Sequence, residues 1–215
     1  MEELAEAGEE EDKSKMAEIK ILVQGYARPG EGEQEEVELA SSTTTLIKEG
    51  KWNIIVDPGM NRKILLEALK KEKLSPSGID YIVLTHYHLD HSLLTGIFEN
   101  AIVIDDASIY TFKGEIKDHK GKIPGTNIDI IKTPGHDQFH CSLLVNTNDL
   151  GKVAIVGDVF WWADGEKQEI DEKSLMNHED PYMKNEKDLK NSRKNVLAVA
   201  DYIIPGHGKM FKVEK

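Results

Sequence analysis

Cysteine, long apolar runs and positive charge are all scarce in this sequence, and each scarcity excludes a class of protein. Cys141 is the single cysteine among 215 residues, so an intrachain disulfide framework is excluded and a reducing compartment is expected. No apolar run reaches the roughly 18 residues of a membrane-spanning helix, so we expect no membrane insertion. Because no apolar segment near the start resembles an export signal either, we expect a cytoplasmic protein.

Acidic residues outnumber basic ones by 39 to 27, which gives a formal net charge of -12 at pH 7. General binding to nucleic acid normally needs a basic face, and this balance does not favour it. Residues 1–17 are acidic and lack apolar periodicity, so they are predicted to form a disordered tail. The hydrophobic content of 39% is enough for one core, and we expect a single domain over residues 18–215.

Histidine and aspartate, by contrast, are concentrated directly after the predicted strand Tyr81–Leu84. Four potential metal ligands follow within one hexapeptide: His86, His88, Asp90 and His91. In an extended loop His86 and His88 point to the same side, whereas a turn into a helix would direct Asp90 and His91 towards a second point. This layout favours two metals over one. A polar loop with incidental histidines does not explain why three of the eight histidines fall in one hexapeptide.

Three further candidate ligands each follow a predicted strand and a glycine: His136, Asp158 and His207. The glycine lets the backbone turn sharply and approach the site closely. Nitrogen and oxygen donors of this kind suit Zn²⁺, and also Fe or Mn.

The motifs THYHLDH, GH, GD and PGHG, in this order, resemble those of the metallo-β-lactamase-fold hydrolase superfamily, over about residues 19–213. The resemblance implies an α+β fold, a four-layer α/β/β/α sandwich, whereas the pattern alone supports only mixed α and β structure. It implies two Zn²⁺ ions per chain, one on His86, His88 and His136 and the other on Asp90, His91 and His207. Asp158 would bridge the two ions.

The spacing within the chain is most similar to that of the small single-domain members of this superfamily. No cysteine stands among the ligands, and 48 residues separate Asp158 from His207, too few for the large domain that the cleavage-factor nucleases insert there.

The function implied is a dinuclear metal-dependent hydrolase, in which a metal-bridging hydroxide attacks an ester, thioester, lactone, β-lactam or phosphodiester bond. Asp90 is expected to orient the hydroxide and handle its proton. Three alternatives stay open: a ribonuclease of the same fold, a mononuclear iron oxygenase of the persulfide-dioxygenase type, and a non-catalytic metal-binding scaffold. The expected partner is a small-molecule or phosphodiester substrate, and a homodimer is left open.

Two further residues are candidates for contacts to the ligands. The resemblance implies that Asp57 supports the histidine loop from behind without binding metal. An ordinary turn is the alternative for Asp57, since it begins an Asp-Pro-Gly sequence. His140, four residues after His136, is either a contact to the site or a hydrogen-bonded structural histidine. His119 lies in a charged run and is expected to be solvated rather than a ligand.

Trp161, Trp162 and Arg193 are candidates for substrate contacts. The two tryptophans open a long polar connection that extends to Lys184, and they are predicted either to line the substrate pocket or to anchor the connection to the core. Arg193 falls on the apolar stripe of the predicted helix Glu186–Ala200. It therefore needs a partner, either a buried carboxylate or an anionic substrate.

Overall fold

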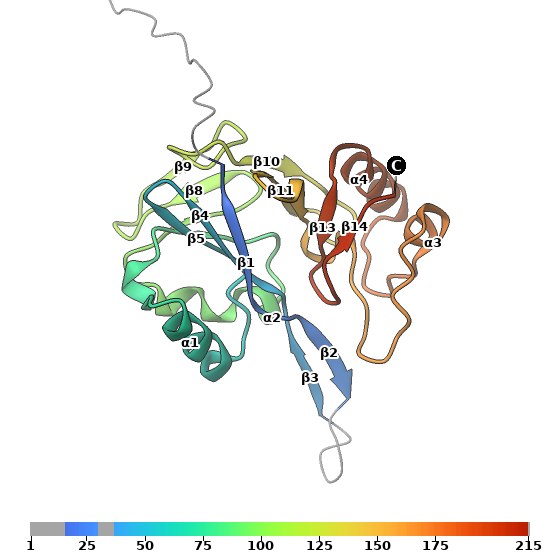
Figure 1. The fold of residues 1–215 in the computed structure, drawn as a ribbon, viewed down its shortest axis with the longest axis horizontal. Helices are drawn as coiled ribbons and strands as arrows, with labels where there is room; N and C mark the ends of the chain where they lie inside the picture. Colours follow the sequence, from blue (N-terminus) through green and yellow to red (C-terminus); the bar gives the residue numbers. More distant parts are fainter. Residues whose placement is uncertain (1–15, 30–36, 215) are drawn as a thin grey trace, which may run out of the picture.

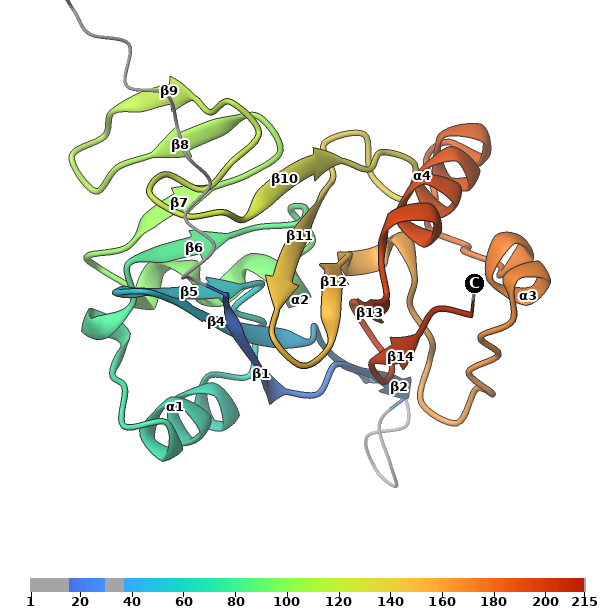
Figure 2. The ribbon, with the colours of Figure 1, turned by 45° about the horizontal axis from the view of Figure 1, so that its top comes forward.

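The strands form two mixed β-sheets that lie face to face in the computed structural model (Figures 1 and 2). The structure describes residues 16–29 and 37–214. Of the tail predicted over residues 1–17, residues 1–15 lie outside these ranges. Ala17 lies inside them, is buried, and donates its backbone N–H to the carbonyl of Asn146 at 3.1 Å, so it already belongs to the packed domain.

The first sheet has seven strands in the order β1-β4-β5-β6-β7-β8-β9. Their bounds are β1 (Glu18–Val23), β4 (Thr44–Glu49), β5 (Trp52–Val56), β6 (Tyr81–Val83), β7 (Ile102–Ile104), β8 (Ser108–Tyr110) and β9 (Ile116–Asp118). β5, β6 and β7 are parallel neighbours, whereas the other pairs are antiparallel. Because parallel strands end at the same edge of a sheet, Asp57 after β5 and the histidine loop after β6 meet there.

The second sheet has five strands in the order β10-β11-β12-β13-β14. Their bounds are β10 (Asp129–Lys132), β11 (Cys141–Thr147), β12 (Gly151–Ile155), β13 (Tyr202–Ile204) and β14 (Phe211–Lys212). β12 and β13 are parallel, so Asp158 and His207, which follow them, reach one edge together. A separate two-stranded hairpin consists of β2 (Tyr26–Pro29) and β3 (Glu38–Ser41).

Apolar side chains from the inner faces of both sheets form the central core. The first sheet contributes Ile54 and Val83, for example, and the second contributes Leu143 and Ile155. Successive residues of a strand point to opposite faces, so the neighbours of these side chains point outward, towards the helices.

One helix covers the outer face of each sheet (Figure 2). α1 (Arg62–Lys71) packs Leu65 and Leu69 on the first sheet. α4 (Glu186–Val199) packs Leu189 and Val196 on the second. Each of these buried side chains contributes about 1.5–3 kcal/mol. The order helix, sheet, sheet, helix confirms the predicted α/β/β/α sandwich.

The other helical segments are short and lie in the connections. They are η2 (Pro76–Gly78), α2 (Leu89–Ser92), η3 (Leu93–Ile97), η4 (Gly157–Val159) and α3 (Glu172–Asn177). Among the residues that the structure describes, no helix has both the length and the apolar character needed to cross a membrane.

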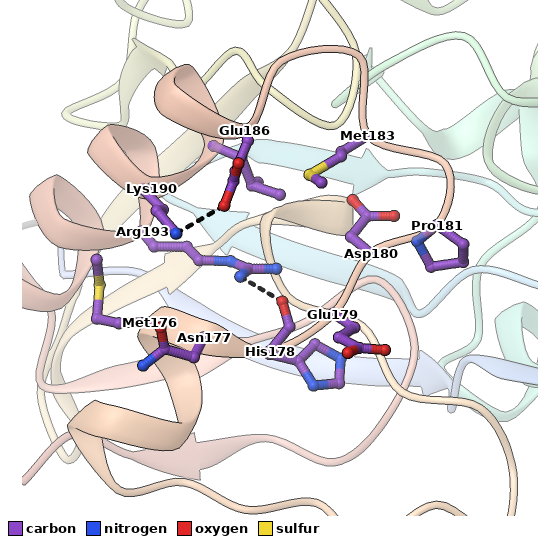
Figure 3. Close-up of a pocket in the computed structure, with 11 residues that line it drawn as sticks. Met176, Asn177, His178, Glu179, Asp180, Pro181, Met183, Glu186, Lys190 and Arg193 are labelled. Atoms are coloured by element: carbon purple, nitrogen blue, oxygen red, sulfur yellow. Dashed lines mark hydrogen bonds and ion pairs between the residues drawn. The ribbon is translucent and has the colours of Figure 1, made fainter.

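A pocket of about 520 Å³ lies between α3, the segment after it and α4 (Figure 3). Most of the segment from Met176 to Met183 lines it, together with one face of α4 that includes Lys190 and Arg193. None of the seven candidate metal ligands lines this pocket, so it is separate from the site that they form.

Gly135, directly before His136, is the point where the loop after β10 touches α4. Its carbonyl accepts hydrogen bonds from the backbone N–H groups of Lys184 and Asn185, at 2.8 and 3.0 Å. Its φ of 138° lies in a region that residues with a side chain rarely adopt, and a Cβ here would lie 2.5 Å from the Cβ of Leu189. The close approach therefore requires glycine.

We expect Gly135→Ala to lower the free energy of unfolding by about 2 kcal/mol or more, because the added methyl group combines overpacking with backbone strain. Denaturant unfolding measures the change. Gly96→Ala is the matched control, since a Cβ at that position would have no described residue within 4 Å apart from its neighbours along the chain, and its effect should stay within about 0.5 kcal/mol. Equal effects of the two substitutions would contradict the packing argument.

Candidate metal centre

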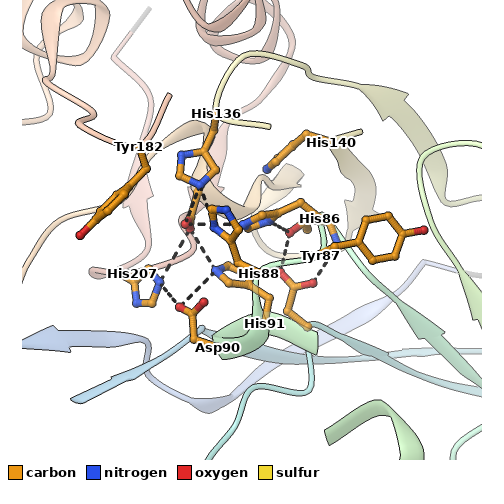
Figure 4. Close-up of polar contacts among 12 residues, drawn as sticks. His86, Tyr87, His88, Asp90, His91, His136, His140, Tyr182 and His207 are labelled. Carbon is orange, nitrogen blue, oxygen red and sulfur yellow. Dashed lines mark hydrogen bonds and ion pairs between the residues drawn. The ribbon is translucent and has the colours of Figure 1, made fainter. Parts of the chain in front are cut away.

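The seven residues predicted as metal ligands come together at one edge of the sandwich (Figure 4). The loop after β6 supplies His86 and His88, and α2 supplies Asp90 and His91. The loop after β10 supplies His136, η4 supplies Asp158, and the turn after β13 supplies His207. Both sheets therefore contribute to the site.

The ligand atoms form two groups, each with its atoms within 4.8 Å of one another. The first group is His86, His88, His136 and Asp158, and the second is Asp90, His91 and His207. In the first group His88 Nδ1 lies 3.2 Å from His136 Nε2, so two ring nitrogens face each other at close range. These groups are consistent with a site for two metal ions.

Asp158 lies between the two groups and presents one oxygen to each. Its Oδ2 is 3.4 Å from His136 Nε2 and 3.8 Å from His86 Nε2. Its Oδ1 is 3.2 Å from His91 Nε2 and 3.9 Å from His207 Nε2. This arrangement is the one that a bridging carboxylate needs.

Three atoms of these groups are buried and have no hydrogen-bond partner of good geometry in the part of the chain that the structure describes: His86 Nε2, His91 Nε2 and Asp158 Oδ1. A buried polar atom left in this state costs about 1–3 kcal/mol. All three are metal-ligand atoms that converge on the same two points, so divalent cations would satisfy them together. The residues present therefore fit a metal centre, and the nitrogen and oxygen donors suit Zn²⁺, Fe or Mn.

The protonation of the first group also favours metal binding. Burial and the neighbouring His91 lower the pKa of His86 well below its usual value. Burial and the neighbouring His136 lower the pKa of His88. Although burial alone would raise it, His91 and His207 hold the pKa of Asp158 well below its usual range. Neutral imidazoles and an ionised carboxylate are the forms that coordinate metal.

His91 is in the opposite situation. Burial alone would lower its pKa, but the carboxylates of Asp158 and Asp57 raise it well above its usual value. A proton on His91 therefore offsets the buried carboxylates when no cation is present. A metal ion that binds His91 must displace this proton.

Asp57 lies behind the histidine loop and binds it through three hydrogen bonds. Its carboxylate accepts from Thr85 N–H at 2.8 Å, from Thr85 Oγ1 at 2.7 Å and from His91 Nδ1 at 2.8 Å. Its φ of 49° is uncommon for a residue other than glycine. Such strain persists only where the surroundings enforce it, which is typical of functional sites. Asp57 thus orients His91 so that Nε2 faces the second group.

Asp180 has a matching role for His136, although no motif in the sequence identifies it. Its Oδ2 lies 2.7 Å from His136 Nδ1, and its Oδ1 accepts from the backbone N–H of Tyr182 at 3.0 Å. The residue is only 3% exposed. The carboxylate holds the Nδ1 proton of His136, so Nε2 is directed at the metal position. The only signal in the sequence is the unusual length of the connection that carries Asp180.

His207 and His140 are also held by neutral partners. His207 Nδ1 donates to the backbone carbonyl of Tyr26 at 3.1 Å, which connects the β2–β3 hairpin to the site. His140 is buried outside both ligand groups, 2.9 Å from Thr133 Oγ1, and its ring stacks on His86 at 5.0 Å between centroids. Burial and the neighbouring His136 lower the pKa of His140 to about 3, so it is neutral. It contacts a ligand and is not itself placed to coordinate.

The two tryptophans occupy different environments. The Trp161 ring centroid lies 6.3 Å from that of His207 and 5.7 Å from that of Tyr182, so it borders the metal centre. Tyr182 is 54% exposed and lies beside His136 and His207 in Figure 4. Trp162 is buried in the core under α4, packed against Phe160. Of the two alternatives predicted for Trp162, the structure therefore shows the second, in which the ring anchors the connection to the core.

Arg193 meets the first of its two expectations only in part, because the buried carboxylate of Asp180 acts on its charge while its hydrogen bonds go to backbone carbonyls. It is 2% exposed, so it does not face substrate, and its main partners are backbone carbonyls rather than a carboxylate. Nε donates to Val159 O at 3.0 Å and Nη1 to His178 O at 2.7 Å.

His119, expected to be solvated, is instead half-buried and hydrogen-bonded to Asp105 O and Gly121 N–H. It takes no part in either ligand group.

The sequence model of the metallo-beta-lactamase superfamily matches residues 37–139, which include five of the seven candidate ligands. The chain is also 30% identical over 230 residues to a relative from Rattus norvegicus, an alignment that covers 91% of this chain and 86% of the relative. The protein therefore belongs to the metallo-beta-lactamase superfamily. The rat relative is metallo-beta-lactamase domain-containing protein 1.

Solved structures show the same fold at lower sequence identity. A Thermotoga maritima protein assigned provisionally to the metallo-beta-lactamases matches with a TM-score of 0.69 and 22% identity, over 92% of this chain and 99% of its own. A quorum-quenching N-acyl homoserine lactone lactonase matches with a TM-score of 0.62 and 18% identity, over 90% of this chain and 92% of its own.

We expect His207→Ala to reduce the metal content from two equivalents to one, because it leaves the second group with only Asp90, His91 and the shared Asp158. Plasma emission on dialysed, reconstituted protein measures the content. His119→Ala is the control and should retain both equivalents, because His119 belongs to neither group. Less than half an equivalent in the wild-type protein after reconstitution would contradict the site.

Proposed function

We propose that the protein is a metal-dependent hydrolase that uses two divalent cations, held by the seven ligands. The single observation that supports this most strongly is the pair of ligand groups that share Asp158, with buried, unpartnered donor atoms directed at both metal positions. Two cations bound there would polarise a substrate oxygen and lower the pKa of a bound water towards neutrality, which would supply a nucleophile at neutral pH. Seven ligands also favour this reading over a mononuclear iron oxygenase.

Asp90 is placed to handle the proton of the attacking water. Its Oδ2 lies 3.1 Å from His207 Nε2, and its side chain is 21% exposed, whereas that of Asp158 is 7% exposed. Burial alone would raise the pKa of Asp90, but the hydrogen bond with His207 and the nearby His91 lower it below its usual value. Asp90 is therefore ionised and can accept a proton on the solvent side of the site.

The surroundings favour an uncharged acyl substrate, such as an ester, thioester, lactone or β-lactam, over a phosphodiester. Among the described residues the carboxylates of Asp90 and Asp158 form ion pairs only with histidines, and the Arg193 guanidinium is bound to carbonyls elsewhere. Exposed apolar and aromatic side chains instead lie close to ligands along the chain, namely Leu89 next to Asp90 and Phe139 three residues after His136, and Tyr182 packs beside Trp161. We infer that these side chains contact the acyl portion of the substrate.

Asp90→Asn should lower kcat by about 10²–10⁴-fold, because an amide cannot accept the proton from the attacking water. Metal content should fall only in part, since the amide oxygen still coordinates. Turnover of ester, thioester, lactone and phosphodiester probes, alongside metal analysis, measures both effects. Asp118→Asn removes an exposed carboxylate on β9 and should leave kcat unchanged. Near wild-type turnover by Asp90→Asn would remove Asp90 from the mechanism.

Tyr182→Ala should raise KM for apolar acyl probes about fivefold, because a ring contact of this kind contributes about 1 kcal/mol. The melting temperature should change little, since the side chain is more than half exposed. Tyr182→Phe keeps the ring and is the control, with an expected KM near that of the wild type. If both variants give the same KM, the ring does not contact the acyl group.

A further inference from the structure

Arg193 is one of the largest fully buried side chains, and its position requires an explanation. A buried charge is costly unless it is well hydrogen-bonded. Burial lowers the pKa of Arg193 to about 10, and the carboxylate of Asp180 opposes this shift. The guanidinium lies 5.5 Å from the centroid of the Phe160 ring, so Phe160 borders its face. α4 thus places a charge deep in its apolar side, where a leucine or methionine would pack without that cost.

The two carbonyls that Arg193 binds belong to residues next to the metal centre. Val159, which accepts from Nε, directly follows the shared ligand Asp158. His178, which accepts from Nη1, lies two residues before Asp180, the carboxylate that holds His136. One planar group therefore holds two points of the connection from β12 to α4, one near its start and one after α3. Arginine suits this task because its donors have a rigid geometry.

The third nitrogen of the Arg193 guanidinium, Nη2, also relates Arg193 to Asp180. Nη2 has no hydrogen-bond partner of good geometry among the described residues, and Figure 3 shows it turned towards the side where Asp180 lies. Asp180 in turn separates the pocket of Figure 3 from His136. Arg193 therefore influences Asp180 in two ways: it binds the backbone carbonyl of His178, two residues before Asp180, and its charge interacts with the Asp180 carboxylate.

We propose that Arg193 is a positioning residue for the first metal site: by holding Val159 and His178, it sets the separation of Asp158 and His136. It touches neither metal nor substrate. The inference rests on the metal centre of the proposed function but not on the reaction that takes place there. If Arg193 were only a core residue, its loss would reduce stability and leave metal affinity unchanged.

The test measures cobalt binding, which needs no turnover. The His207→Ala background isolates the first group, so Co²⁺ titration followed by visible absorption reports on that group alone. In this background we expect Arg193→Met to weaken Co²⁺ binding by about 10–100-fold and to alter the absorption bands, as loss of a residue that orients ligands typically does. Lys190→Met is the matched control, because Lys190 lies on the same helix and pocket but, within the described ranges, forms an ion pair only with Glu186.

Arg193→Lys covers the case in which the methionine variant does not fold. Lysine keeps the charge but cannot hold two carbonyls in one plane, so intermediate Co²⁺ affinity is expected. Wild-type affinity and spectrum in either folded variant, whatever its melting temperature, would overturn the proposal. If the wild-type protein binds cobalt but hydrolyses no probe, the proposed hydrolase fails while the Arg193 comparison still stands. If the wild-type protein binds no cobalt, both fail.

Discussion

The carboxylate of Asp158, buried among the histidines of both ligand groups, is the contact on which the site depends. Isolated, such a charge would be too costly to bury, so it needs a positive partner, which is either protonated His91 or a bound cation. The first sheet supplies His86 and His91, whereas Asp158 follows a strand of the second. The electrostatics of one carboxylate therefore connect the two halves of the sandwich. Backbone contacts across the same edge support this connection, such as Thr43 N–H to Gly206 O at 2.6 Å.

The ligands are held from behind by groups that do not bind metal. Asp57 orients His91, Asp180 orients His136, and the carbonyl of Tyr26 orients His207. Each partner lies on a different element, and each determines which ring nitrogen faces the site. The raised pKa of His91 adds a second property, since a proton can replace a cation as the partner of Asp158 and Asp57. The fold thus has a means of balancing its buried carboxylates before metal arrives.

The ligands could be predicted from the sequence because each one directly follows a strand and a glycine or lies in one hexapeptide. The outer helices could be predicted from their apolar stripes, and the four layers from resemblance. Asp180 could not, because its contact to His136 spans 44 residues and nothing local distinguishes it from its neighbour Glu179. For Trp162 and Arg193 the sequence left two alternatives open, for a related reason. An aromatic side chain in a long connection, or a charged side chain on the apolar face of a helix, can occupy several different environments. Tertiary packing determines which one it occupies.

The order of the ligands along the chain has a consequence for biosynthesis. His86, His88, His136 and Asp158 all precede α4, whereas the second group is incomplete until His207 has been made. A domain generally folds as a unit during synthesis. The backbone next to Asp158 is held by Arg193 of α4, and β12 gains its parallel neighbour only when β13 is in place. The two ligand groups therefore take their final geometry together, once α4 and β13 have both been made.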